Sequence, residues 1–368
     1  MRVSGEGIHA WALAGALLVG CSPAPDDYDV PPFEWEGEHV RFATDYNDGD
    51  YCEGNLGYLD AYVGKLAALV GDGAADAVDY YWLRDPPADY GPPCDYSACT
   101  LGDRVYTRWL PHEHELVHAT LPGDAARFFE EGMAVYWGDD IDALGPLQGD
   151  VHSAIAGSSD SLELESYALA GHFMASLVER FDPKTVLQLD DETALRDSVP
   201  EMEDGFARAL GEPLDEAVDD YESTYPSCEH LVFRSAFFEC DAAPMTVCDG
   251  DDATTEFDLD VSCANPKALG PRQGTVWVNV ALEIPLPGRY TIKGVQGEGG
   301  SRRGFMRLKR CAGGCEGMVF ENETQWPSDE FVGAIFASNL DAGRYVLQVH
   351  QPAEHTGMVH VVVHCPDA

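Results

Sequence analysis

Basic residues are scarce in this sequence, which has 22 Lys and Arg against 65 Asp and Glu and a formal net charge of −43. Proteins that bind nucleic-acid phosphates carry a basic patch or stripe, so this composition excludes that class of function. A strongly acidic surface favours a soluble monomer. The chain is 45% hydrophobic, too apolar for a disordered acidic protein, and its 368 residues are enough for about two domains.

Long apolar runs are also missing after the first twenty residues, so no later segment is expected to span a membrane as a helix. Residues 1–20 contain Arg2 and then an apolar run, Ile8–Val19, of the length found in signal peptides. The run ends at Leu18–Cys21, whose sequence Leu-Val-Gly-Cys resembles the lipobox of bacterial lipoproteins. The resemblance implies a lipid anchor at Cys21 and a place in the bacterial cell envelope, facing the periplasm or the exterior. A secretory signal cleaved elsewhere is the alternative.

Cysteine, in contrast, is abundant, with eleven residues. Without Cys21 an even number remains, which suits disulfides in an oxidising compartment. The remaining residues are Cys52, Cys94, Cys99, Cys228, Cys240, Cys248, Cys263, Cys311, Cys315 and Cys365. Cys94 and Cys99 share a loop rich in Pro, Gly and Asp, so we expect a local disulfide between them. Residues 21–39 have no Lys or Arg and several prolines, which predicts an acidic tether.

Residues 40–226 are predicted to form one domain with a small N-terminal sheet followed by helices. Apolar residues at helical spacing from Leu59 to Val70 predict a helix that ends at Gly71. From Leu110 to about Tyr225 the apolar pattern remains helical. The expected strands are rich in β-branched and aromatic residues: Val40–Phe42, Val78–Leu83 and Val105–Thr107.

Residues 227–368 follow a different pattern. Apolar and polar residues alternate over Phe257–Val261 and Val276–Val280, and turn-forming residues separate the runs, which predicts a disulfide-rich β-sandwich. Pro287–Ile292 and Ala342–Leu347 both contain Gly-Arg-Tyr, which places a turn glycine before a strand whose tyrosine can face the core. This half resembles the small jelly-roll domains appended to secreted bacterial peptidases. The expected fold class is therefore α+β.

The strongest functional signal is His114–His118, with the sequence His-Glu-Leu-Val-His. On a helix, positions i and i+4 share one face, so both imidazoles can bind one metal ion. Glu115 lies about a third of a turn away and can reach a water on that ion without being a ligand. The Leu-Val pair inside the motif is expected to face the core. His112 cannot share the face of His114, so we expect it at the surface. An acidic helix with surface histidines is the alternative for the whole motif.

A second segment, Phe128–Trp137, surrounds the sequence Glu-Glu-Gly with apolar residues at helical spacing. It resembles the gluzincin (peptidase MA-like) zinc peptidases, in which the glutamate before the glycine is the third zinc ligand. The resemblance implies that Glu131 joins His114 and His118, leaving a fourth position on zinc for water. Glu130 is the alternative third ligand. Glycine inside a helix costs about 1 kcal/mol, so we expect Gly132 to permit close approach of another backbone or of the metal site.

A third segment, Ser166–Phe181, is expected to be one helix and resembles the Tyr-x-x-Ala-Gly-x-Phe helix of the same peptidases. Phe206–Gly211 resembles their following Phe-x-x-x-Leu-Gly segment. The resemblance implies that Tyr167 stabilises the oxyanion of the tetrahedral intermediate, the alternative being a tyrosine packed at a helix start. His172 is expected to be a buried, hydrogen-bonded histidine.

One position departs from the family pattern. Gluzincins often carry a carboxylate four residues after the third ligand, where it orients a zinc-binding histidine. This sequence has Val135 at that position. Asp139, Asp140 or a backbone carbonyl could take the orienting role.

Together these resemblances imply a mainly helical zincin-type domain and a lipid-anchored zinc (Zn2+) metallopeptidase that acts on a peptide or protein substrate. Zinc would activate a water, and Glu115 would accept its proton as general base. The alternative is a non-catalytic surface lipoprotein with a vestigial or structural zinc site, but a structural site has no use for Glu115. A calcium-dependent adhesion module is disfavoured, because Asp249–Asp252 lacks the ligand spacing of an EF-hand loop.

Overall fold

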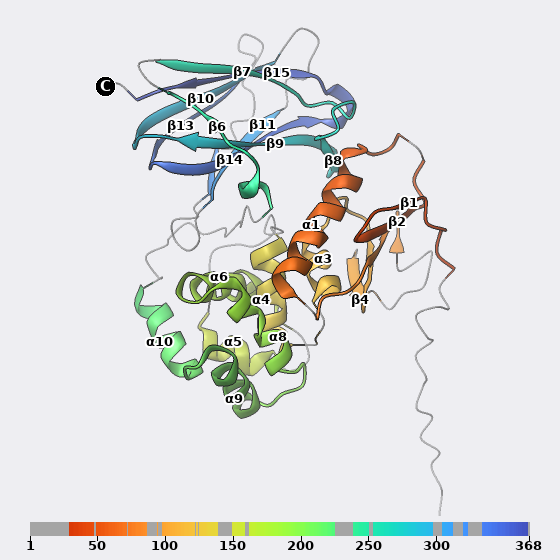
Figure 1. The fold of residues 1–368 in the computed structure, drawn as a ribbon, viewed down its shortest axis with the longest axis vertical. Coiled ribbons are helices and arrows are strands. Elements are labelled where there is room, and N and C mark those ends of the chain that lie inside the picture. The colour runs from red at the N-terminus through yellow and green to blue at the C-terminus, as the bar shows by residue number, and fades with distance from the viewer. Residues whose placement is uncertain are drawn as a thin grey trace, which may run out of the picture.

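A computed structural model describes residues 29–366 except 48, 72, 87–93, 95–97, 122, 124, 139–148, 159–161, 225–237, 250–252, 297–303, 312–318 and 323–332. Several sequence predictions lie outside this part, namely those on residues 1–28 with Cys21, on Asp139 and Asp140, on Cys228 and Cys315, and on most of Asp249–Asp252. The described chain is α+β, as expected, with a helical part that carries a small sheet and a β-rich part beside it (Figure 1).

The helical part comes first in the chain. Its elements are β1 (Trp35–Glu36), β2 (Val40–Thr44), α1 (Gly54–Val70), β3 (Val78–Trp82), β4 (Ala98–Leu101), β5 (Arg104–Thr107), α3 (Glu113–Thr120), α4 (Arg127–Gly138), α5 (Val151–Gly157), α6 (Leu164–Arg180), α7 (Pro183–Leu187), α8 (Leu189–Glu192), α9 (Val199–Leu210) and α10 (Leu214–Thr224). The three strands and the helix predicted before residue 110 are therefore confirmed, and α1 ends as expected at Gly71, whose N–H donates to the carbonyl of Ala67.

The small sheet has the strand order β1-β2-β3-β5-β4, with β2, β3 and β5 parallel and the two edge strands antiparallel. Every residue of β3 is buried, because helices cover one face and a smaller apolar cluster covers the other. Phe33 packs in that smaller cluster, and Trp35 belongs to β1. Strand pairing thus begins before residue 40, inside the segment that its acidic composition predicted to be a tether. These two aromatic residues bury apolar surface there.

The β-rich part contains η2 (Glu239–Asp241), β6 (Met245–Thr246), β7 (Thr254–Asp260), β8 (Leu269–Arg272), β9 (Thr275–Ile284), β10 (Gly288–Gln296), β11 (Phe305–Arg310), β12 (Val319–Asn322), β13 (Gly333–Leu340), β14 (Gly343–Pro352), η4 (Ala353–His355) and β15 (Met358–His364). One sheet has the order β13-β10-β15-β7 and the other β12-β11-β14-β9-β6, with β8 added beside β9. Side chains from both sheets share one core. The predicted β-rich second half is therefore confirmed.

The repeated Gly-Arg-Tyr segments begin strands β10 and β14. Tyr290 and Tyr345 are both buried, as predicted. Each hydroxyl donates to the carbonyl four residues earlier, from Tyr290 to Leu286 over 2.7 Å and from Tyr345 to Asp341 over 3.1 Å. The same hydrogen bond thus closes the turn before each strand.

Four disulfides lie in the described part: Cys52–Cys263, Cys94–Cys99, Cys240–Cys311 and Cys248–Cys365. The expected Cys94–Cys99 bond is confirmed. Cys52–Cys263 joins the start of α1 to the β-rich part, and the Asn55 side chain adds hydrogen bonds to the N–H and carbonyl of Gly270. The two parts are therefore held together at one end of α1 (Figure 1). Disulfides in this number indicate an oxidising compartment.

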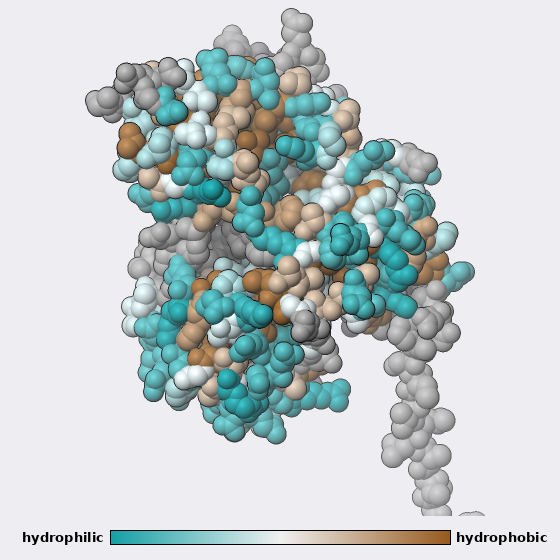
Figure 2. Space-filling view, viewed as in Figure 1, coloured by the Kyte–Doolittle hydropathy of each residue, from teal (hydrophilic) through white to brown (hydrophobic). Residues whose placement is uncertain are grey.

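The surface reflects the composition. Figure 2 shows hydrophilic residues spread over both parts of the molecule, with apolar residues in smaller patches. Among the described residues, every helix is too short or too polar to cross a membrane.

Candidate metal centre

Helix α3 carries both histidines of the motif on one side and packs its other side into the main core. Leu116 and Val117 have no exposed surface and lie in the main core, as predicted. Because these two residues fix the helix against the core, His114 and His118 keep a common orientation toward α4. The imidazoles are mostly buried, with 12% and 10% of their side chains exposed.

Helix α4 supplies the carboxylates. It can approach its neighbours closely because it contains two glycines at contact points. A Cβ at Gly132 would lie 2.9 Å from the carbonyl oxygen of Ala170 on α6, which is the close backbone approach predicted for this glycine. A Cβ at Gly138 would lie 2.5 Å from the Cα of His114. The end of α4 therefore packs directly on the backbone of the first histidine.

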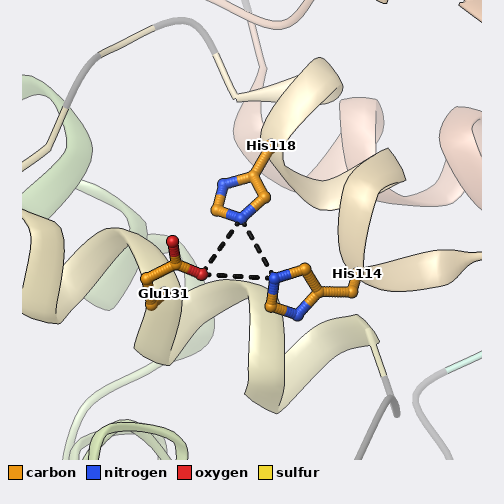
Figure 3. Close-up of side chains that lie close together, drawn as sticks. All are labelled: His114, His118 and Glu131. Carbon is orange, nitrogen blue, oxygen red and sulfur yellow. Dashed lines mark hydrogen bonds and ion pairs between the residues drawn. The ribbon is translucent and has the colours of Figure 1, made fainter. Parts of the chain in front are cut away.

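Three side chains from these two helices point to one centre (Figure 3). The Nε2 atoms of His114 and His118 are 3.2 Å apart. Oε2 of Glu131 lies 3.2 Å from Nε2 of His114 and 3.3 Å from Nε2 of His118. Ligands of a tetrahedral ion with bonds of about 2.0–2.1 Å are separated by about 3.3 Å. In the described part of the chain, His114, His118 and Glu131 form the group whose ligand atoms lie close enough together to hold a metal ion.

The charges of this group are strongly coupled in the metal-free protein. Burial alone would lower the pKa of His118, but the negative charge of Glu131 and hydrogen bonds with Glu130 and Glu131 raise it well above its usual value. Burial would likewise raise the pKa of Glu131, but the positive charge of His118 and the close polar contacts of both imidazoles lower it well below its usual value. The buried Oε2 of Glu131 accepts no well-aligned hydrogen bond in the described part of the protein. A cation at the centre would satisfy it.

Glu115 lies on α3 but outside the triangle of ligand atoms. Its carboxylate faces the edge strand β4, where the Thr100 hydroxyl lies 2.8 Å from Oε2 and 3.1 Å from the Glu115 carbonyl oxygen. The hydroxyl thus holds one oxygen of the carboxylate.

Tyr167, near the start of α6, lies beside the same group. Its ring stacks on that of His114, with 6.1 Å between ring centroids. Burial, then the negative charge of Glu131 and a hydrogen bond to it, raise the pKa of Tyr167 above its ordinary value. The phenol therefore stays protonated over the whole physiological pH range and can donate a hydrogen bond.

Glu130, the alternative third ligand, does not join the triangle. Its Oε1 lies 3.4 Å from Nδ1 of His118, on the far side of the imidazole ring. Arg127 forms ion pairs with both glutamates, over 2.8 Å to Oε2 of Glu130 and 3.4 Å to Oε1 of Glu131. Val135 is buried in the core, and its apolar side chain cannot orient a histidine as a carboxylate would.

Two other histidines were assigned roles from the sequence. The prediction for His172 is confirmed, because it is 1% exposed and its Nδ1 lies 2.7 Å from the hydroxyl of Tyr221. The surface position expected for His112 is wrong, since this residue is 2% exposed. Its Nδ1 lies 2.9 Å from Oγ1 of Thr107. The helical-face argument excluded His112 from the metal group but could not show that β5 buries its ring.

Sequence reasoning missed three residues that contact this site. Thr100 belongs to a short strand whose partner in space is not indicated by any local pattern. Arg272 reaches Glu113, the first residue of α3, from the β-rich part. Arg127 could have been found, because it stands four residues before Glu131 on the same helix, where oppositely charged side chains are neighbours.

Comparisons with known proteins add no family assignment. The sequence matches no protein-family model and no curated protein. The pre-peptidase C-terminal domain of a collagenase from Bacillus anthracis matches with a TM-score of 0.22 and 11% identity, over 33% of this chain and 91% of that domain. An isomalto-dextranase from Arthrobacter globiformis T6 matches with a TM-score of 0.16 and 18% identity, over 26% and 17% of the two chains. A cycloisomaltooligosaccharide glucanotransferase from Paenibacillus matches with a TM-score of 0.13 and 10% identity, over 89% and 57%. Similarities this low carry no argument about fold or function.

Proposed function

We propose that the protein is a zinc metallopeptidase with a zincin-type helical domain of the gluzincin kind, in which His114, His118 and Glu131 hold the metal. The observation that carries the proposal is the near-equilateral triangle of two Nε2 atoms and one carboxylate oxygen, with sides of 3.2–3.3 Å. Glu115 follows the first histidine and stays outside this triangle. Two imidazoles and one carboxylate are the ligands of known catalytic zinc sites, which keep one position open.

Zinc bound at this site would act as a Lewis acid, lowering the pKa of a water and polarising the carbonyl of the substrate. Glu115 accepts the proton of the attacking water and passes it to the nitrogen of the leaving amine. Thr100 holds Oε2 of this carboxylate. The base therefore presents its second oxygen in one orientation.

Tyr167 supplies the remaining polar group. Its protonated hydroxyl donates a hydrogen bond to the oxygen of the scissile carbonyl as negative charge develops there. The ring is held by its stack on His114, so the donor is in place before the substrate binds. A neutral donor at this point stabilises the tetrahedral intermediate without a proton transfer.

The variant Glu115→Gln tests the proposal, because it keeps the side-chain volume and removes the proton acceptor. The parent protein should bind about one zinc per chain and cleave members of a diverse peptide library. The variant should keep the zinc and the fold, but its rate of peptide hydrolysis should fall by about 10²-fold or more. Equal cleavage by the two proteins would exclude Glu115 as the base. A zinc-loaded parent that cleaves nothing would favour the alternative of a non-catalytic lipoprotein.

The cellular location proposed for this activity is the bacterial cell envelope, with the protein facing the periplasm or the exterior and anchored through lipid on Cys21. The sequence Leu-Val-Gly-Cys at Leu18–Cys21 supports it. The variant Cys21→Ala should move the protein from the membrane fraction to the soluble fraction. Unchanged membrane partitioning would exclude the lipid anchor.

A further inference from the structure

Two charged side chains beside the metal centre have no part in the chemistry proposed above. Arg127 and Glu130 lie on α4 within one turn of Glu131 and are only 25% and 16% exposed. Burying an ion pair is costly unless its geometry is good. The contacts of each group indicate what this pair does.

Glu130 contacts the back of a metal-binding histidine. Its Oε1 lies 3.4 Å from Nδ1 of His118, whose Nε2 faces the metal centre. This Nδ1 is buried and has no acceptor in hydrogen-bond geometry in the described part of the chain, and Glu130 is the carboxylate within reach of it. A histidine that binds metal through one ring nitrogen usually donates the other N–H to a carboxylate, which fixes the tautomer and the ring orientation. Glu130 is placed to accept that hydrogen bond.

Arg127 contacts the back of the carboxylate ligand in a similar way. Its Nη1 donates to Oε1 of Glu131 over 3.4 Å, while Oε2 of the same carboxylate faces the two histidines. The same guanidinium pairs with Glu130 over 2.8 Å. Nη1 makes both contacts, so one permanently charged group lies between the two carboxylates. Without it, two adjacent glutamates could compete for one ion.

We infer that Arg127 and Glu130 are positioning residues. Glu130 orients His118, and Arg127 restricts Glu131 to one ligand oxygen. This inference rests on the metal centre of the proposed function but does not depend on peptide hydrolysis.

The role of Glu130 is tested by zinc affinity, measured on metal-free protein by competition with a chromogenic chelator. Glu130→Ala removes the acceptor and should weaken zinc binding about 10–100-fold while leaving about one zinc per chain at saturation. Glu130→Gln keeps an acceptor oxygen and should lie between the parent and the Ala variant, and it remains informative if the Ala variant fails to fold. Parental affinity in both variants would overturn the role of Glu130.

The role of Arg127 is tested by the visible spectrum of the Co2+-loaded protein, because four-coordinate Co2+ absorbs several-fold more strongly than five-coordinate Co2+. In Arg127→Met the freed Oε1 of Glu131 can become a second ligand oxygen, so the absorption per bound Co2+ should fall at least twofold. Arg180→Met is a matched control, since Arg180 is 28% exposed and pairs with Glu212 over 2.8 Å away from the site. A parental spectrum in Arg127→Met would overturn the role of Arg127.

The outcomes for the two proposals are separable. Altered affinity and spectrum in the variants, together with no peptide cleavage by the zinc-loaded parent, would support the positioning roles and remove the peptidase. Normal cleavage by the parent and parental metal binding in all variants would support the peptidase and overturn the positioning roles. A parent protein that binds neither ion would overturn both.

Discussion

Arg272 of the β-rich part forms an ion pair with Glu113, the residue directly before His114 of the candidate metal centre. Nη1 of Arg272 lies 3.2 Å from Oε2 of Glu113, and the two side chains are only 15% and 9% exposed. Glu113 begins α3, where a carboxylate also interacts favourably with the positive end of the helix. The second half of the chain therefore helps to fix the helix that carries the site, and is more than an appended module.

The first prediction concerns this ion pair. Arg272→Met removes the cation that pairs with the buried Glu113 carboxylate, which should lower the free energy of unfolding by about 3 kcal/mol. The double variant Glu113→Gln with Arg272→Met removes both charges of the pair and should recover much of that loss. Calorimetric unfolding of the metal-free proteins measures both.

Arg344→Met is the control for the ion-pair prediction. Arg344 pairs with Glu283 over 3.5 Å, and these side chains are 49% and 36% exposed. Solvent screens an exposed pair, so the control should cost less than about 1 kcal/mol. A double variant no more stable than Arg272→Met would contradict the argument from buried charge.

The second prediction concerns the ligand set. His118→Ala and Glu131→Gln each remove one corner of the triangle and should lose most of the bound zinc, because a catalytic zinc has only three protein ligands. Glu130→Gln should retain about one zinc per chain at saturation, since Glu130 contacts the back of His118 and not the metal centre. Zinc content per chain, measured after dialysis against a zinc concentration that saturates Glu130→Gln, tests all three. Equal zinc in Glu131→Gln and the parent would rule out Glu131 as the third ligand.

Much of the site follows from local sequence, because helical spacing is a local property. The i and i+4 spacing of His114 and His118 brings their imidazoles together whatever surrounds the helix. The choice between Glu130 and Glu131 is different, since it depends on how α4 is rotated against α3. Gly138 allows the close contact that fixes this rotation, and one sequence read alone does not show it.

The features that sequence could not give come from distant segments. Thr100 reaches Glu115 across 15 positions, and Arg272 reaches Glu113 across 159. The disulfide Cys52–Cys263 spans 211 positions. The even number of cysteines predicted disulfides but could not show that these two residues pair. Strand pairing and domain docking decide such contacts. The local pattern still gave most strands and helices, because alternation and helical periodicity record which face is buried.

The third prediction concerns the orientation of Glu115. Thr100→Val has nearly the same shape as the parent residue but removes the hydroxyl that holds Oε2. Hydrogen bonds to charged groups contribute about 1.5–3 kcal/mol, so kcat/KM for peptide cleavage should fall about tenfold or more. Zinc content should not change, because neither residue is a ligand.

Thr100→Ser is the matched control for the orientation of Glu115. It retains the hydroxyl and loses only a methyl group, so its activity should stay close to that of the parent. If Thr100→Val and Thr100→Ser were equally active, the hydrogen bond would have no part in positioning the base.

The last prediction is independent of the metal and concerns His172. Burial between α6 and α10 lowers the pKa of His172 to about 4, whereas an unfolded histidine titrates near about 6.5. Between these two values the unfolded chain binds the proton and the folded chain does not, so protonation favours unfolding as the pH falls from about 6.5 to about 4. The stability lost by this route is about 3 kcal/mol at most, and it is fully present above pH 6.5.

His172→Gln keeps a side chain that can hydrogen-bond to the hydroxyl of Tyr221 but cannot take up a proton. The variant should therefore lose less stability than the parent between about pH 6.5 and pH 4, where the carboxylates contribute equally to both proteins. Denaturant unfolding at several pH values gives the difference directly. The control is His152→Gln, because the side chain of His152 is 48% exposed and its replacement alters no buried group. Parallel stability curves for His172→Gln and the parent would show that His172 is not kept neutral by burial.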